Sequence, residues 1–322
     1  MIAKLAEEII KNKKRLSKND DLDFLIDCDL DELSFYANKI RQHFRDNSIN
    51  FCTIINGKGG GCKENCKFCA QSAHNHTGFK IHSFLETDEI LDDCKKRAEN
   101  GIDWYSIVTA GRKLSGDDFD KAVKTFNILS KECDIKLCAS FGLLDYDDFM
   151  KLKQSGVTRI HANIETSRNF FPNICTTHTF DDKINCIKVA KKAGLEVCSG
   201  GIIGMGESFN DRIDMALELA ELDVNSIPIN ALLPVKGTAL ENYESLTEDE
   251  IIRTIGIFRF INPEKEIRLA AGRALIKEGG KRGFLSGADA TITGDMLTTT
   301  GTSIKSDFEL REKVKTELDN LN

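Results

Sequence analysis

The chain has 322 residues and a formal net charge of −7, and 41% of its residues are hydrophobic while 30% are charged. This composition supplies enough apolar material for a sizeable core, and the acidic balance without a long basic run argues against nucleic acid as the main partner. No apolar stretch is long enough to span a bilayer, and residues 1–16 have the pattern of a charged amphipathic helix rather than that of a signal peptide. We therefore expect a cytoplasmic protein without a membrane partner.

The elements expected along the chain fall into two parts. Residues 1–45 predict a helical extension, and from about residue 50 short apolar or β-branched runs alternate with longer segments of helical apolar spacing. Carboxylates in the following turn make Thr87, Asp117 and Thr247 plausible helix caps. Helices are predicted at 87–101, 117–132, 211–223 and 247–262. Strands are predicted at 51–56, 104–110, 135–140, 158–165, 195–203, 225–233, 266–271 and 290–293.

This alternation of strands and helices predicts the α/β class. Eight strands followed by helices favour a (β/α)8 barrel of the TIM type, with ligands at the carboxyl ends of the strands. An open doubly wound sheet would show the same local pattern. We expect residues 46–322 to form one barrel domain with a C-terminal tail, preceded by the helical extension.

The chain contains 11 cysteines, an odd number that argues against a disulfide framework. In a reducing compartment the remaining uses of a thiol are metal ligation and burial as a small hydrophobic group. Five of the cysteines have no ligand spacing, and we expect them to be core or surface thiols: Cys28, Cys52, Cys94, Cys133 and Cys186.

Three other cysteines follow the first predicted strand directly. In the segment GKGGGCKENCKFCAQSA, Cys62, Cys66 and Cys69 have C-x3-C-x2-C spacing. Iron–sulfur clusters are held by cysteine thiolates, and three thiolates leave one iron of a four-iron cluster open to a small molecule. The preceding glycines let the backbone fold tightly around a bulky cluster. The triplet therefore predicts a 4Fe–4S cluster.

A zinc site is the alternative interpretation of the triplet. Zinc prefers four ligands, and His74, His76 or His82 could supply the fourth. The chain would then be a zinc-binding regulatory protein rather than an enzyme.

With Phe68 before the last cysteine, the triplet resembles the signature of the radical S-adenosylmethionine superfamily. The resemblance implies that S-adenosylmethionine binds the open iron and is cleaved reductively to a 5′-deoxyadenosyl radical, while the protein supplies placement and excludes side reactions. A low-potential electron donor of the flavodoxin or ferredoxin type is implied as a partner.

From about residue 50 to residue 303 the chain resembles the biotin synthase family. This resemblance implies a radical sulfurtransferase that converts dethiobiotin to biotin, works as a homodimer and takes the sulfur from an auxiliary iron–sulfur cluster. Another radical enzyme of the same barrel type, such as a maturase or a mutase without an auxiliary cluster, is the nearest alternative. The matching stretches are CKFCAQSAH, IETS, TTHTFDD, VCSGGIIGMGES, SIPINALLPVKGT, IRLAAGR and DMLTTTG.

Residues for S-adenosylmethionine follow from the resemblance. It places Phe68 at the cofactor, Asn163 and Glu165 at the ribose, and Lys183 at the carboxylate, where the family often has arginine. A carboxylate suits a diol because both of its oxygens accept hydrogen bonds. An asparagine at a strand end can equally well satisfy backbone groups.

Residues for dethiobiotin follow in the same way. The resemblance places Asn230 at the ureido ring, since an amide offers both a donor and an acceptor, and Thr298 and Thr299 near the valerate carboxylate. Threonine pairs are also common caps. His161 and Ala162 stand where the family has asparagine and histidine, which puts one substrate contact in doubt.

The ligands of the auxiliary cluster depart from the family pattern. The resemblance implies a 2Fe–2S cluster with three cysteines and one arginine, of which this chain keeps Cys138, Cys198 and Arg268, while Ser106 replaces the remaining cysteine. Serine is a harder and less acidic ligand than a thiol. Our hypothesis is that Cys138, Cys198 and Cys175 bind a variant four-iron cluster with an extra sulfide. Cys138 and Cys198 would then also be catalytic, because this cluster supplies the sulfur. Alternatively, Cys175 is a packed thiol.

Overall fold

The computed structural model describes residues 1–294 and 301–320, and all eight predicted strands are present in it. The sheet has the strand order β5-β4-β3-β2-β1-β9-β8-β7-β6, and a further pairing of β5 with β7 closes it into a barrel. The predicted TIM-type barrel is thus confirmed, and the open sheet is excluded. The strands, parallel in each pairing, are β1 (Asn50–Lys58), β2 (Trp104–Thr109), β3 (Lys136–Ser140), β4 (Arg159–His161), β5 (Glu196–Cys198), β6 (Gly201–Ile203), β7 (Ser226–Ala231), β8 (Glu266–Leu269) and β9 (Ala290–Ile292).

The strands β5 and β6 are two pieces of one predicted strand. The chain leaves regular pairing at Ser199 and Gly200 and rejoins the sheet at Gly201. Counted together as one strand, the two pieces give eight strand positions around the barrel, as the sequence predicted. We call each of these eight positions a stave.

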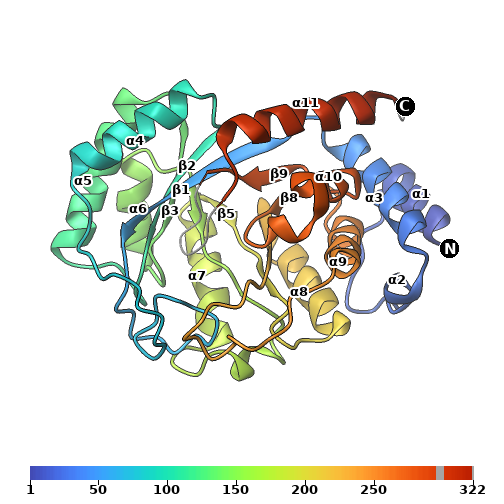
Figure 1. Ribbon diagram of the computed structural model, residues 1–322, viewed down its shortest axis with the longest axis horizontal. Helices are drawn as coiled ribbons and strands as arrows, with labels where there is room; N and C mark the ends of the chain where they lie inside the picture. Colours follow the sequence, from blue (N-terminus) through green and yellow to red (C-terminus); the bar gives the residue numbers. More distant parts are fainter. Residues whose placement is uncertain (295–300, 321–322) are drawn as a thin grey trace.

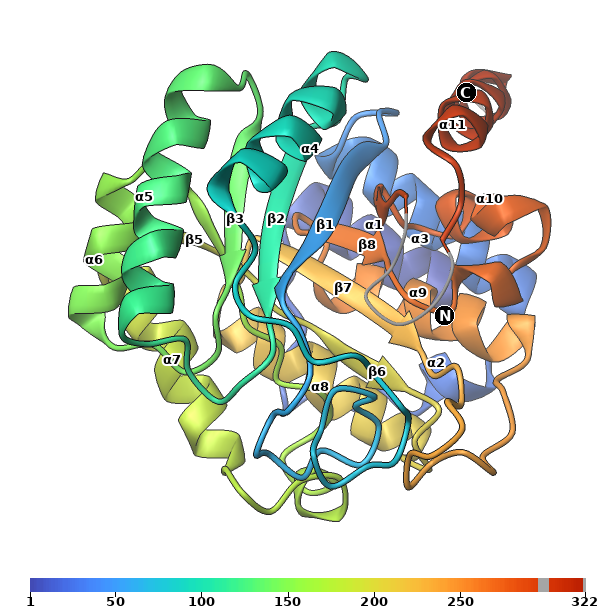
Figure 2. The ribbon, with the colours of Figure 1, turned by 60° about the vertical axis from the view of Figure 1, so that its left-hand side comes forward.

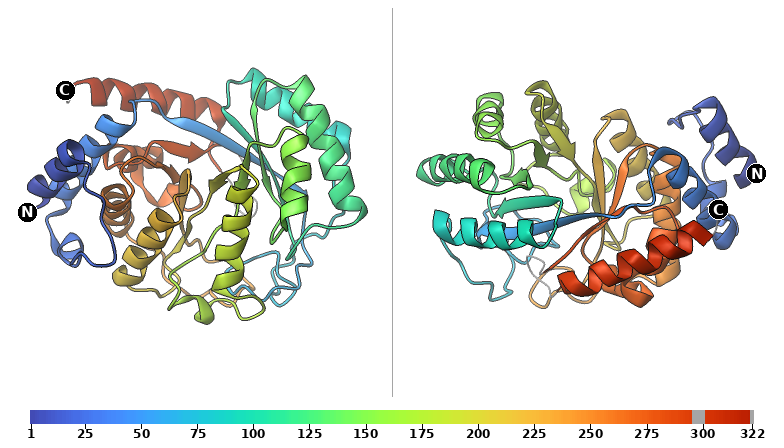
Figure 3. Two further views of the ribbon diagram at one scale, coloured as in Figure 1. Left: turned by 180° about the vertical axis from the view of Figure 1, so that it is seen from behind. Right: turned by 90° about the horizontal axis from the view of Figure 1, so that it is seen from above.

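Helices surround the barrel (Figures 1 and 2). Helix α3 packs against α9 and α1 packs against α3, beside the barrel (Figure 3). In the part of the chain that the structure describes, no helix has the length and apolar character needed to cross a membrane. The helices are α1 (Ile2–Asn12), α2 (Phe24–Asp27), α3 (Leu30–Phe44), α4 (Thr87–Glu99), α5 (Asp117–Glu132), α6 (Tyr146–Gln154), α7 (Phe180–Lys192), α8 (Phe209–Glu221), α9 (Glu248–Ile261), α10 (Lys277–Leu285) and α11 (Ile304–Asn320), with 3-10 turns η1 (Phe171–Asn173) and η2 (Arg273–Leu275).

Only one of the three expected caps is confirmed. Thr247 accepts a hydrogen bond from the backbone of Glu250 and forms a capping box with its side chain. Thr87 is instead the first residue of α4, with Glu86 as the N-cap, and its hydroxyl lies 2.9 Å from that of Thr125. Asp117 is likewise the first residue of α5, and Gly116 is the N-cap. Acidic residues in a first turn identify a helix start only to within a residue or two.

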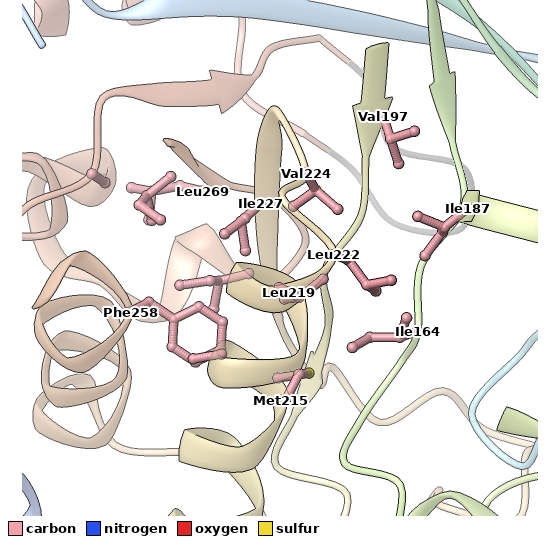
Figure 4. Packing of buried hydrophobic residues seen from close by; sticks show 14 of the residues in the cluster. Ile164, Ile187, Val197, Met215, Leu219, Leu222, Val224, Ile227, Phe258 and Leu269 are labelled. Carbon is pink, nitrogen blue, oxygen red and sulfur yellow. The ribbon is translucent and has the colours of Figure 1, made fainter. Parts of the chain in front are cut away.

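The apolar core lies between the strands and the helices. Leu219 of α8, Ile227 of β7 and Phe258 of α9 are buried and gather there (Figure 4). Successive side chains of a strand point to opposite faces, so Ile267 and Leu269 enter this core while Arg268 points into the barrel. The barrel interior is therefore free for polar and sulfur-bearing side chains.

A buried arginine ties α9 to the strands. Arg259 has 0% exposure and donates hydrogen bonds to the carbonyls of Gly287 (2.8 Å) and Lys265 (2.7 Å). It also donates to Asp289 at 2.8 Å, and Asp289 accepts from the amide of Ile267 at 2.7 Å. The guanidinium thus joins α9 to the segments that enter β8 and β9.

We expect Arg259→Ala to lower the free energy of unfolding by about 3–5 kcal/mol, because it leaves the Asp289 carboxylate buried without this partner. Chemical denaturation would measure the change. Arg282→Ala, which removes a surface ion pair with Asp249, is the control and should cost about 1 kcal/mol or less. Equal losses in the two variants would contradict the assigned role of Arg259.

Candidate active site

The loop that carries the three cysteines lies at the end of the barrel to which β1, β2 and β7 point (Figure 2). The amide of Cys62 donates to the carbonyl of Gln71 at 3.0 Å, and the side-chain amide of Asn75 donates to the carbonyls of Cys66 and Cys69 at 3.2 and 2.8 Å. Gly60 has φ of 75°, a conformation that other residues rarely adopt. These bonds fold the loop back on itself and hold the three thiols on one short segment.

A second loop, between β4 and α7, clamps the triplet loop. The Oδ1 atom of Asn65 accepts from the amides of Thr176 (2.9 Å) and Thr177 (3.2 Å), and the amide of Lys67 donates to the carbonyl of Ile174 at 2.9 Å. The position of the three thiols therefore depends on the segment that follows β4.

A buried carboxylate strengthens this clamp. Glu64, between the first two cysteines, accepts a hydrogen bond from the hydroxyl of Thr177 at 2.8 Å and pairs with Nδ1 of His178. Burial would lower the pKa of His178, but its hydrogen bonds with Cys175 and Glu64 outweigh burial and raise that pKa. The pair is an electrostatic link between the two loops that sequence reasoning missed, since 114 positions separate the partners.

Cys175 lies in the same clamp. Its sulfur is 3.7 Å from the sulfur of Cys66 and 3.3 Å from Nδ1 of His178. Hydrogen bonds from Cys66 and then from His178 lower the pKa of the Cys175 thiol. The structure thus brings Cys175 to the triplet, and it does not place it on the wall of the barrel cavity where Cys138 and Cys198 lie.

The geometry favours a cluster over a single zinc ion at the triplet. Among the described residues, the compact group of possible metal ligands at this loop is Cys66, Cys175 and His178, whose ligand atoms all lie within 4.8 Å of one another, and it includes neither Cys62 nor Cys69. One tetrahedral ion holds its ligands close together, whereas a four-iron core separates them. The histidine expected next along the chain, His74, directs Nε2 to the carbonyl of Lys63 at 3.1 Å instead. The residues present fit a 4Fe–4S cluster.

The residues expected at S-adenosylmethionine lie together beside the split strand. The amide of Gly200 donates to Oδ1 of Asn163 at 3.0 Å, and Nζ of Lys183 is 3.7 Å from Oε1 of Glu165. Glu165 has φ of 72°, which is uncommon for a residue with a side chain and is maintained here by backbone pairing with Gly200 and Ile202. A side chain at residue 200 would place a Cβ atom 2.0 Å from the carbonyl oxygen of Pro228, so only glycine fits.

One cavity of about 300 Å³ joins the triplet loop to the barrel interior. Phe68 and Cys69 contribute to its wall from the loop, and Asn163 contributes from the end of β4. Cys52, which we expected to be a core or surface thiol, also lies on this wall. The residues on the wall that come from inside the barrel include Cys52, Ser106, Cys138, Arg159, His161, Cys198, Asn230 and Arg268.

The residues expected at dethiobiotin are placed in part. Asn230 lies on the cavity wall, where its amide donates to the carbonyl of Gly201 at 3.0 Å and accepts from the amide of Ala271 at 3.2 Å. One donor and one lone pair remain for a ligand. His161 also faces the cavity, and burial lowers its pKa to about 4, which keeps the ring neutral at pH 7. Thr298 and Thr299 lie outside the described residues.

Charged groups line the inner end of the cavity. Arg268 pairs with Glu266 and donates to the carbonyl of Thr291 at 2.8 Å, while Arg159 is 3.3 Å from Glu266. Burial alone would lower the pKa of Arg268, but the Glu266 carboxylate outweighs it and raises that pKa. Arg268 is therefore held as a cation. To ligate iron directly, its guanidinium would have to lose a proton, and the neighbouring Glu266 carboxylate disfavours that loss.

A TIM-type barrel with a three-thiol loop after β1, and a cavity leading from that loop to inner thiols, defines a radical S-adenosylmethionine enzyme. Residues 58–220 match the model of the Radical SAM superfamily, and residues 228–316 match that of the Biotin and Thiamin Synthesis associated domain.

Two curated relatives extend these matches over nearly the whole chain. The biotin synthase of Alkaliphilus metalliredigens is 57% identical, with 96% of this chain and 97% of the relative covered. That of Clostridium beijerinckii is 58% identical, with 94% and 96% covered. The chain belongs to the biotin synthase family, and the zinc-protein, maturase and mutase alternatives are set aside.

Solved structures show the same fold at low identity. The crystal structure of methylornithine synthase has a TM-score of 0.82 and 20% identity, and it covers 99% of this chain and 100% of its own. That of HydG, a maturase of the [FeFe]-hydrogenase, has a TM-score of 0.75 and 16% identity, covering 90% and 67%. At these identities the likenesses show the fold alone.

We expect Asn65→Ala to loosen the triplet loop, because the amides of Thr176 and Thr177 lose their acceptor. The loss of about 1 kcal/mol should speed release of iron from reconstituted protein to a chelator about fivefold. Asn100→Ala, at the exposed end of α4, is the control. Identical rates of iron release in the two variants would show that the clamp does not hold the cluster loop.

Proposed function

We propose that this chain inserts sulfur into dethiobiotin to give biotin, with S-adenosylmethionine as the source of the radical. The observation that carries the proposal is one continuous cavity whose wall includes both residues of the triplet loop and the inner thiols. A substrate in that cavity would lie between the two groups that the reaction needs. Membership of the biotin synthase family supports the choice of substrate.

Two inorganic groups fit the described residues. Cys62, Cys66 and Cys69 would hold a 4Fe–4S cluster, and Cys138 and Cys198 would belong to an auxiliary cluster, with Arg268 beside it. When bound, the first cluster supplies the electron that cleaves S-adenosylmethionine, and the auxiliary cluster supplies sulfur.

Protein groups then position the cofactor. Glu165 would accept hydrogen bonds from the ribose diol, and Asn163 would stand beside it, held by Gly200. Lys183, which is ion-paired with Glu165, would place its positive charge beside the carboxylate of S-adenosylmethionine. Because the backbone fixes Asn163 and Glu165, the cofactor would bind to a site formed in advance.

The cavity wall suits a small, mostly apolar substrate with a urea group. Its volume of about 300 Å³ lies within the usual range for ligand pockets. Asn230 retains one donor and one acceptor for the ureido ring, and the neutral ring of His161 offers another polar contact without a charge. Thr298 and Thr299 remain our prediction for the valerate carboxylate. Apolar wall residues such as Ile54 and Val108 would keep water from a reactive carbon.

The partners and location carry over from the family resemblance. We expect a low-potential donor of the flavodoxin or ferredoxin type, because the 4Fe–4S cluster needs an external electron for each cleavage. A homodimer and a cytoplasmic location are predicted on the same ground. Sedimentation of the reconstituted protein would measure its oligomeric state.

Anaerobic incubation of reconstituted protein with S-adenosylmethionine, a reductant and dethiobiotin should yield biotin and 5′-deoxyadenosine. Mass spectrometry of the quenched reaction measures both products. Dethiobiotin left intact, while 5′-deoxyadenosine accumulates, would refute the proposed substrate but not the radical chemistry.

We expect Glu165→Gln to weaken the binding of S-adenosylmethionine about tenfold to a hundredfold, because charged hydrogen bonds to the ribose are lost. Titration calorimetry of cluster-loaded protein would measure the dissociation constant. Asp181→Asn alters an exposed carboxylate on α7 and should leave that constant unchanged. Wild-type affinity in Glu165→Gln would remove Glu165 from the cofactor site.

A further inference from the structure

Four side chains that point into the barrel come from alternate staves. Cys52 is on β1, Cys138 on β3, Cys198 on β5 and Arg268 on β8, which are the first, third, fifth and seventh staves when β5 and β6 count as one. All four are on the wall of the same cavity. In TIM-type barrels, interior side chains stack in layers of four, each layer built from alternate strands. The three thiols and the guanidinium have the arrangement of one such layer.

Electrostatic coupling supports this layer. The thiol of Cys52 interacts with Arg268 and Cys198, and that of Cys138 interacts with Cys198 and Cys52. Arg268 in turn interacts with Cys52 and Cys198. Each of the four groups is therefore a near neighbour of at least two others.

Two other candidates for the third ligand fit less well. Ser106 faces the cavity from β2, opposite Cys138 in the strand register, but a neutral hydroxyl is a poor ligand for iron in a sulfide cluster. Cys175 lies 3.7 Å from Cys66 in the clamp of the triplet loop, and it is not on the cavity wall. Cys52 is the thiol that faces Cys138 and Cys198.

We propose that Cys52 is the third thiolate ligand of the auxiliary cluster, together with Cys138 and Cys198. This inference rests on the proposed function, since it assigns a ligand to the cluster that supplies sulfur there. The thiol that the family pattern expects on β2 would be supplied in this chain from the neighbouring strand β1, whose Ile54 is paired with Ser106. Arg268 and Arg159 would balance the negative charge of three thiolates and their sulfides.

Iron counting tests the inference without reference to turnover. In a background with Cys62, Cys66 and Cys69 changed to alanine, the iron that remains after anaerobic reconstitution belongs to the auxiliary site. We expect Cys52→Ala to lower that iron and its sulfide at least fivefold and to abolish the cluster's Mössbauer signal. Cys186→Ala is the matched control, because Cys186 is a buried thiol of α7 outside the cavity. It should retain the iron content of its parent.

The same measurement separates the rival ligands. Cys175→Ala and Ser106→Ala should each retain the auxiliary iron of the parent. Loss of iron in either of them, with iron kept in Cys52→Ala, would overturn the proposal. Circular dichroism checks that each variant is folded. If Cys52→Ala fails to fold, Cys52→Ser replaces it in the test, because the serine hydroxyl fills similar space but is a poor ligand for iron. Wild-type iron in folded Cys52→Ser would equally overturn the proposal.

A second readout uses chains with an intact triplet. Cys52→Ala should still cleave S-adenosylmethionine to 5′-deoxyadenosine while total iron falls to the amount that the triplet cluster alone holds, about four per chain. If wild-type protein makes no biotin but Cys52→Ala still loses the auxiliary iron, the proposed substrate fails and the ligand assignment stands. If wild-type protein makes biotin and Cys52→Ala keeps all its iron, the ligand assignment fails alone.

Discussion

The alternation of side chains along each barrel strand is the constraint on which the rest of this structure depends. One face of every strand must pack against the outer helices, and its residues are apolar, as with Ile267 and Leu269 on β8. The other face is released from that demand and can carry sulfur and charge, as with Arg268 between them. The closed barrel thus provides an interior in which thiols and charged side chains are surrounded by hydrogen-bonded backbone.

The buried charged side chains in that interior are paired with one another. Glu266 lies between Arg159 and Arg268, and Ser226 donates to it at 2.6 Å. Burial would raise the pKa of Glu266, but the two arginines outweigh it and lower that pKa to about 2. Arg159 also lies over the ring of Trp104, 3.6 Å from its centroid. A network of this kind keeps its geometry only if every member is present, which suits a site that must position metal ligands.

Much of the fold could be predicted from the sequence, because strand and helix periodicities are local properties. All eight staves lie where the apolar runs predicted them, and the spacing of Cys62, Cys66 and Cys69 is a signal within eight residues. The positions of Cys52 and Cys175 relative to the other thiols could not be predicted in the same way. Which staves share a layer depends on the closure of the barrel, and the clamp joins loops that are more than a hundred residues apart. Alternation along β1 could have indicated that Cys52 faces inward, but not which groups it faces.

The break between β5 and β6 has a consequence for how the reactants are spaced. Cys198 ends the first piece inside the barrel, and two residues later Gly200 bonds Asn163 and Glu165. Two residues of extended chain span about 7 Å at most. The spacing between Cys198, the proposed ligand of the auxiliary cluster, and the residues proposed for the ribose, Asn163 and Glu165, is therefore fixed by covalent backbone and its hydrogen bonds. A shift of this strand that displaces Cys198 would therefore displace Asn163 and Glu165 as well. It would also reach Asn230, whose side-chain amide donates to the carbonyl of Gly201.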